Sequence, residues 1–123
     1  MTRADWIVLI AAVLPYVVVG FAKFRPDYDN TAPRVQLPGA PGWRGRVYAA
    51  HLNAFEAFAP FAAGVILAEQ HHASQALVDA LASVFLAARV AHPVCYARNW
   101  AALRSTIWVL GFLCVVGLFI SAA

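Results

Sequence analysis

Charged residues are scarce in this chain of 123 residues. They make up 12% of the sequence, whereas 63% of the residues are hydrophobic. A soluble domain is close to half apolar and about one quarter charged, so the composition excludes an ordinary soluble globular protein. The sequence instead predicts a single integral membrane domain that covers residues 1–123.

Cysteines and groups of metal-binding residues are also rare. Cys95 and Cys114 lie in apolar contexts without a metal or redox spacing, so we interpret both as buried thiols. His71 and His72 adjoin without further ligands nearby, which favours exposed turn residues and predicts no metal site. The net charge of +3 is small and scattered, and this excludes nucleic acid as a partner.

Four apolar stretches fill most of the chain, and each is about 20 residues long, enough to cross a bilayer as a helix. We expect spans at about residues 6–24, 45–68, 74–96 and 102–120. The expected fold is therefore all-α, an integral membrane four-helix bundle in contact with lipids. The first stretch lacks a basic n-region and a clear cleavage site, so we expect it to stay as a span.

The connections between the spans differ in composition. Residues 25–43 hold four of the seven prolines and show no apolar periodicity, which predicts a loop with turns at Asp29-Asn30 and Pro38-Gly39. Residues 69–72 predict a short polar turn. Ser74, which follows this turn, is a candidate helix N-cap.

Basic residues are concentrated on one side of the expected spans. The first and third connections are flanked by Lys23, Arg25, Arg34, Arg44, Arg46, Arg98 and Arg104. The opposite side has only Arg3. The positive-inside rule then places these connections in the cytoplasm and both termini on the non-cytoplasmic side, which we expect in a bacterial inner membrane.

The second expected span carries polar side chains that a membrane helix rarely holds without a partner or a function. At 100° per residue, Arg46, Asn53 and Glu56 fall on one face. His51 points nearly the opposite way, so we expect it to pack against another helix. The other three side chains should face something other than lipid.

The third and fourth spans add polar groups at the same membrane depth. Arg89, His92 and Tyr96 share one face at spacings i, i+3 and i+7, and Arg104 and Ser105 open the fourth span. Together with the second span they form a set of cations, a buried carboxylate, an amide and hydroxyls. This set predicts a site for a polar, anionic ligand that enters from the cytoplasm.

Internal pairing is the alternative interpretation of the same residues. Glu56 would then neutralise Arg89 or Arg46, and Asn53 would bond a backbone carbonyl of a neighbouring helix. This interpretation leaves several cations without a partner.

Three stretches resemble motifs of the MAPEG family, the membrane-associated proteins of eicosanoid and glutathione metabolism. RVYAAHLNAFEAFAPF, residues 46–61, is similar to the second-helix signature of this family. ARVAHPVCY, residues 88–96, resembles its third helix, and LRS, residues 103–105, resembles the opening of its fourth. The residues that carry the likeness include Arg46, Val47, Ala50, His51, Leu52, Asn53, Glu56, Pro60, Phe61, Arg89, His92, Tyr96, Leu103, Arg104 and Ser105.

The resemblance implies a four-helix subunit that assembles as a homotrimer and binds glutathione between neighbouring subunits, near the cytoplasmic face. It implies that Arg104 activates the thiol, with Tyr96 and Ser105 as catalytic candidates. The expected glutathione-binding residues are Lys23, Arg46, Asn53, Glu56, Arg89 and His92. Arg25 is an alternative to Lys23 at the end of the first helix.

One position departs from the family pattern. Many members carry an arginine four residues before the helix-two asparagine, where this chain has Ala49. Arg46, one helical turn away, is placed to substitute in part.

Two functions follow from the resemblance. The first is a membrane-bound glutathione-dependent transferase or peroxidase that activates a thiol for attack on a lipophilic electrophile arriving from the lipid. The second is a non-catalytic scaffold of the same fold that binds a lipid or a thiol. Arg104 with Tyr96 favours the enzyme, and Ala49 favours the scaffold. A small transporter is a third possibility, against which the motifs argue.

Overall fold

The computed structural model describes residues 1–123, which form five helices and no strands. The helices are α1 (Arg3–Lys23), α2 (Pro33–Gln36), α3 (Trp43–Gln70), α4 (Gln75–Arg98) and α5 (Ala101–Ser121). All except α2 are long and apolar enough to cross a membrane. The predicted all-α fold with four long apolar helices is confirmed.

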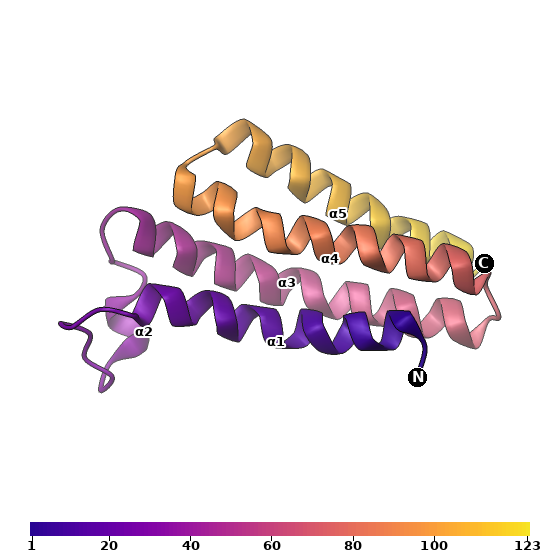
Figure 1. The fold of residues 1–123 in the computed structure, drawn as a ribbon, viewed down its shortest axis with the longest axis horizontal. Helices are drawn as coiled ribbons and strands as arrows, with labels where there is room; N and C mark the ends of the chain where they lie inside the picture. Colours follow the sequence, from indigo (N-terminus) through magenta and orange to yellow (C-terminus); the bar gives the residue numbers. More distant parts are fainter.

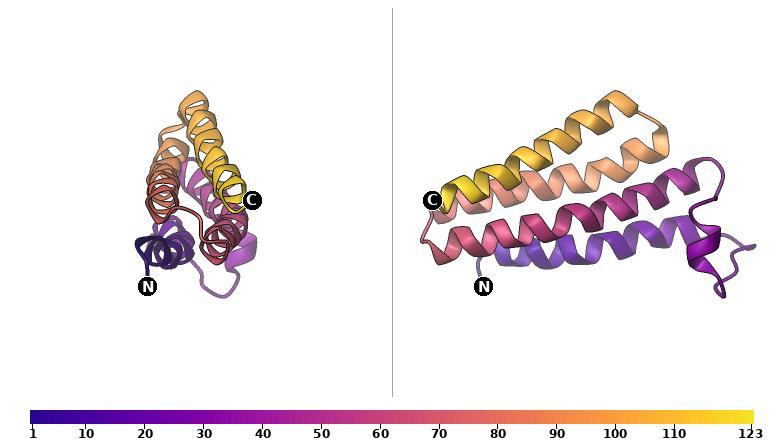
Figure 2. Two further views of the ribbon diagram at one scale, coloured as in Figure 1. Left: turned by 90° about the vertical axis from the view of Figure 1, so that its right-hand side faces the viewer. Right: turned by 180° about the vertical axis from the view of Figure 1, so that it is seen from behind.

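The four long helices lie lengthwise and alternate in direction (Figure 1). The loop end of the bundle carries residues 24–42 and the short α4–α5 connection, and the terminal end carries both chain termini and the α3–α4 turn (Figures 1 and 2). Helix α5 packs along α4 and diverges from α3 toward the loop end (Figure 1). As a result, α5 does not cover the part of α3 that lies at the loop end.

The α1–α3 connection contains a helix that the sequence did not predict. The expected loop is interrupted by α2, which begins at Pro33, a residue whose fixed φ suits a first helical position. Leu37 follows α2 and is buried against α1 and α3, which anchors the turn. Nearby, the Thr31 N–H and hydroxyl donate to the Asp29 carboxylate and lower its pKa.

Helix α1 begins at Arg3, three residues earlier than expected. The Thr2 hydroxyl accepts from the Asp5 N–H at 3.1 Å, and the Asp5 carboxylate accepts from the Thr2 N–H at 2.8 Å. This reciprocal capping box satisfies two backbone donors at the helix start. A threonine followed three residues later by an acidic residue is visible in the sequence and could have predicted this start.

A polar cluster joins three helices at the terminal end. The Thr2 hydroxyl donates to Glu69 at 2.7 Å, and Asp79 accepts from the Ala4 N–H at 3.0 Å. Gln75 donates to both carboxylates. Glu69 is thus the hydrogen-bonded end of α3 rather than part of a solvated turn.

The α3–α4 turn follows Glu69. His71 and His72 are both exposed there, as predicted. Ser74 stands at the N-cap of α4, but its side chain makes no capping hydrogen bond.

The main hydrophobic core lies toward the same end and joins all four long helices. Its centre is a stacked pair, Phe61 on α3 and Phe85 on α4, with ring centroids 3.9 Å apart. Cys95 and Cys114 are both buried free thiols, which confirms their interpretation. A smaller cluster around Val18 holds α1 and α3 together at the loop end.

His51 packs against α1, as expected from its position opposite the polar face. Its Nδ1 lies 2.7 Å from the carbonyl oxygen of Pro15, and its ring contacts Phe55 edge-on. This histidine therefore holds two helices together and points away from the other polar residues of α3.

Candidate functional site

Asn53 is the centre of a polar chain that runs from α4 to the surface of α3. Its Oδ1 accepts from Arg89 Nη1 at 3.0 Å, and its Nδ2 lies 3.4 Å from Glu56 Oε2. Arg89 is only 5% exposed, and its buried Nε has no hydrogen-bond partner. The pattern differs from the internal pairing considered above, because Asn53 lies between the cation and the carboxylate.

Glu56 is exposed on the surface of the subunit and makes no ion pair. The interpretation as a buried carboxylate is therefore wrong for a single subunit. It lies near the middle of α3, so its carboxylate is at membrane depth with the Asn53 amide as its polar contact.

Gly111 lets α5 lie directly against the Arg89 guanidinium. A Cβ at this position would come within 2.7 Å of Arg89 Nη2 and 3.3 Å of its Cζ. The α5 backbone can approach the Arg89 guanidinium this closely only because residue 111 has no side chain. Gly111 therefore helps to hold Arg89 toward Asn53.

The end of α4 brings Tyr96 under Arg104. Asn99 adopts a left-handed conformation with φ of 60°, and the Trp100 N–H donates to the Cys95 carbonyl at 2.9 Å. This tight C-terminal turn starts α5 two residues later. The Arg104 guanidinium then lies 4.6 Å from the centroid of the Tyr96 ring, within the range of a cation–π contact.

Two neighbouring residues complete this group. The buried His92 ring packs edge-on against Tyr96, with centroids 5.1 Å apart. The Ser105 hydroxyl donates to the Ala101 carbonyl at 3.1 Å, one turn back in α5.

These residues line two adjoining cavities between α3, α4 and α5. The cavity nearer the loop end has a volume of about 260 Å³ and is lined by Asn53, His92, Tyr96, Arg104, Ser105, Trp108 and Val109. The deeper one, of about 200 Å³, is lined by Asn53, Glu56, Ala57, Pro60, Arg89, Trp108, Phe112 and Val115. Seven of the nine candidate residues thus meet in one region, where Asn53 and Trp108 belong to both cavities.

The sequence model of the MAPEG family matches residues 4–123 of this chain. The chain belongs to the MAPEG family. No curated protein and no solved structure matches it. Family membership and the four long apolar helices together make this an integral, multi-pass membrane protein.

Two expected residues of this MAPEG chain lie outside both cavities. Arg46 donates from Nε to the Tyr96 carbonyl at 2.9 Å and from Nη2 to the Ala97 carbonyl at 3.0 Å, both in the last turn of α4. Lys23 ends α1, and its ammonium lies 5.8 Å from the centroid of the Tyr28 ring. Neither side chain is part of the lining within a single subunit.

Trp108 lines both cavities and is a residue that the sequence interpretation missed. It stacks on Phe112 with centroids 5.5 Å apart and forms one wall of both cavities. Trp108 lies four residues after Arg104, and residues at this spacing share one face of a helix. The position of Arg104 on α5 therefore predicts that Trp108 faces the same site.

Proposed function

We propose that this MAPEG protein is a membrane-bound glutathione-dependent transferase or peroxidase that activates a thiol for attack on a lipophilic electrophile. The observation that carries the proposal is the stacking of Arg104 on Tyr96 at 4.6 Å, in a cavity that Asn53 also lines. A permanent cation and a phenol are thereby available to one bound atom.

Glutathione supplies the nucleophile, a thiol whose ordinary pKa of about 8.5 leaves it mostly protonated at neutral pH. A guanidinium offers a positive charge and several donors, so Arg104 is suited to stabilise the thiolate. The Tyr96 hydroxyl makes no hydrogen bond within the chain, whereas the Ser105 hydroxyl already donates its proton to the Ala101 carbonyl. Tyr96 is therefore the stronger candidate to donate to sulfur, and His92 holds its ring.

The remaining lining residues fit a zwitterionic peptide such as glutathione. Arg89 lines the deeper cavity, and a guanidinium there suits a ligand carboxylate. Glu56 lines the same cavity and makes no ion pair, since the Asn53 amide is its one polar contact, so its carboxylate suits an amino group. Asn53, bonded to Arg89, orients this part of the site.

We further propose a homotrimer in which a second copy covers the exposed face of α3. An uncovered carboxylate at the depth of Glu56 is costly in lipid, so protein must meet it. In such a trimer, Lys23 and Arg46 would contact the ligand that is bound to a neighbouring subunit. In the same proposal the loop end, which carries most of the basic residues, faces the cytoplasm.

A non-catalytic scaffold is the second candidate function, and Ala49 favours it. Arg46, the residue placed to replace the missing arginine, already donates to two carbonyls of α4. A scaffold would bind the thiol or a lipid without lowering the thiol pKa.

Titration of thiolate absorbance for glutathione bound to the purified protein separates the two functions. In Arg104→Ala the pKa of the bound thiol should rise and kcat should fall on the order of 100-fold, as for loss of one donor to an anion. In Asn53→Ala the main effect should be a higher KM, because an amide holds the ligand without adding charge.

Arg98→Ala is the matched control, since Arg98 is exposed at the end of α4 and lines neither cavity. It should leave both the pKa and kcat unchanged. An Arg104→Ala protein with wild-type kcat and thiol pKa would remove Arg104 from the mechanism. Binding without thiolate in the wild type would establish the scaffold.

A further inference from the structure

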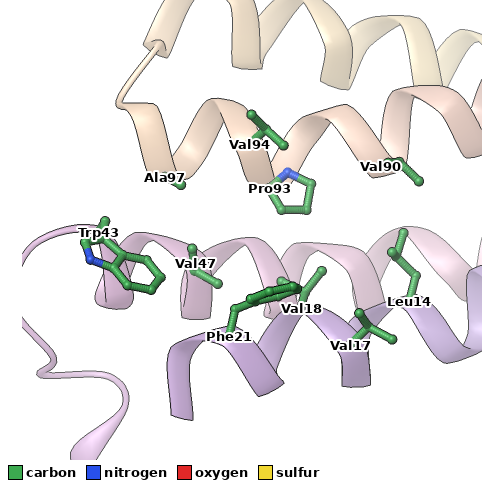
Figure 3. Close-up of a pocket in the computed structure, with 10 residues that line it drawn as sticks. All are labelled: Leu14, Val17, Val18, Phe21, Trp43, Val47, Val90, Pro93, Val94 and Ala97. Atoms are coloured by element: carbon green, nitrogen blue, oxygen red, sulfur yellow. The ribbon is translucent and has the colours of Figure 1, made fainter. Parts of the chain in front are cut away.

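A third cavity lies on the other side of α4, between α1 and α4, and Trp43 and Val47 of α3 also line it (Figure 3). Its volume is about 390 Å³. Nearly all its lining side chains are hydrocarbon: Leu14, Val17, Val18, Phe21, Trp43, Val47, Val90, Pro93, Val94 and Ala97. We call it the α1–α4 groove.

The groove is separate from the polar site. Arg89 and His92 line the polar cavities between α3, α4 and α5, whereas Val90 and Val94 line the groove. No residue lines both the groove and either polar cavity. An occupant of the groove would therefore not compete with a ligand beside Arg104.

The outer rim of the groove faces the surroundings of the bundle. Val17 and Phe21 on α1 are 51% and 63% exposed, and Val90 and Val94 on α4 are each 52% exposed. Because these helices are membrane-spanning segments, what surrounds this rim is hydrocarbon. The shape and chemistry of the groove suit an extended acyl chain.

A cation without a partner stands at one end of the groove. Trp43 forms that end, as Figure 3 shows, and the Arg44 guanidinium lies 4.8 Å from the centroid of its ring. Arg44 makes no ion pair or hydrogen bond, and its buried Nε is unsatisfied. Arg98 follows Ala97 at the same end and is exposed. No acidic residue lines the groove, so this end is complementary to an anion.

We propose that the α1–α4 groove binds one acyl chain of an anionic phospholipid, with the phosphate of the head group on Arg44. The apolar lining favours an acyl chain, and the Arg44 guanidinium favours a head group with a negative charge. A zwitterionic lipid would place the same chain in the groove but would gain less from Arg44. The proposal does not depend on thiol chemistry at the polar site.

The test uses the fluorescence of Trp43, which lines the groove. Replacing Trp6, Trp100 and Trp108 by Phe leaves Trp43 as the one emitter. The protein is placed in phosphatidylcholine vesicles that contain either brominated phosphatidylglycerol or brominated phosphatidylcholine, and bromine quenches on contact. Half-maximal quenching should need about fivefold less of the anionic lipid, the factor expected for one basic residue.

Arg44→Gln in this background should remove the fivefold preference, whereas Arg34→Gln, an exposed arginine of α2, should keep it. Val94→Phe fills the groove and should reduce quenching by both lipids at low mole fraction. Circular dichroism checks that each variant keeps its helices.

Equal quenching by both lipids in the parent protein would overturn the proposal. So would an equal loss of preference in Arg34→Gln and Arg44→Gln. Protection of Trp43 from both brominated lipids would also overturn it, because a second copy of the chain would then cover the groove.

Discussion

Replacing Gly111 by alanine should release Arg89 from its place beside Asn53. The new methyl group would lie 2.7 Å from Arg89 Nη2, whereas ordinary contact begins at 3.4 Å. The guanidinium is planar and rigid, so moving Nη2 by at least about 0.7 Å moves Nη1 with it. The 3.0 Å bond from Nη1 to Asn53 then lengthens beyond useful range.

The expected cost follows from two opposing effects. A hydrogen bond that involves a charged group contributes about 1.5–3 kcal/mol, and this is lost. Alanine in place of glycine inside a helix gains about 1 kcal/mol. The net result is a destabilisation of about 0.5–2 kcal/mol, and the proposed binding of glutathione should also weaken because Arg89 shifts in the lining of the deeper cavity.

Thermal unfolding in mild detergent measures this cost, and Gly20→Ala is the matched control. Gly20 also lies inside a long helix, but a Cβ there meets no atom within 4 Å, so its replacement should be neutral or stabilising. In an Asn53→Ala background the cost of Gly111→Ala should shrink, since the bond is already absent. A Gly111→Ala protein as stable as Gly20→Ala, or an equal cost in both backgrounds, would refute the reasoning.

Three further predictions concern orientation, assembly and Glu56. Single cysteines at Val35 and His71, both exposed, should be labelled from opposite sides of sealed vesicles, and labelling from one side contradicts the topology. Native mass spectrometry in mild detergent should show three copies, and monomers or dimers alone contradict the trimer. Glu56→Gln should lower the melting temperature, or reduce the rise in melting temperature that the ligand causes, more than Asp27→Asn in the exposed loop does. The reason is that a subunit interface would enclose Glu56. Equal, negligible effects would leave Glu56 outside any buried network.

Helical periodicity was enough to group most of the site residues. Asn53 and Glu56 share a face at a spacing of three, and Arg89 and His92 do likewise, so their convergence required only that α3 and α4 pack together. The contact of Arg46 with carbonyls of Tyr96 was not predictable in this way. It joins residues 50 positions apart and depends on where α4 ends.

Two other features needed the tertiary structure. The short helix α2 is followed by Leu37, which is buried against α1 and α3, and no periodic signal exists over four residues. The role of Gly111 depends on the distance between α5 and Arg89, which the sequence does not contain. By contrast, the start of α1 was encoded locally by Thr2 and Asp5 and was overlooked.

The polar cluster around Thr2, Glu69 and Asp79 has a consequence for how this protein can evolve. That cluster and the main hydrophobic core stabilise the terminal end, whereas the candidate site is nearer the loop end. Substitutions at Arg104 or Trp108 therefore remove few core contacts and leave folding largely intact. The residues of the proposed ligand site can therefore be exchanged at one end of the bundle, while the polar cluster and the core at the other end keep the four helices packed.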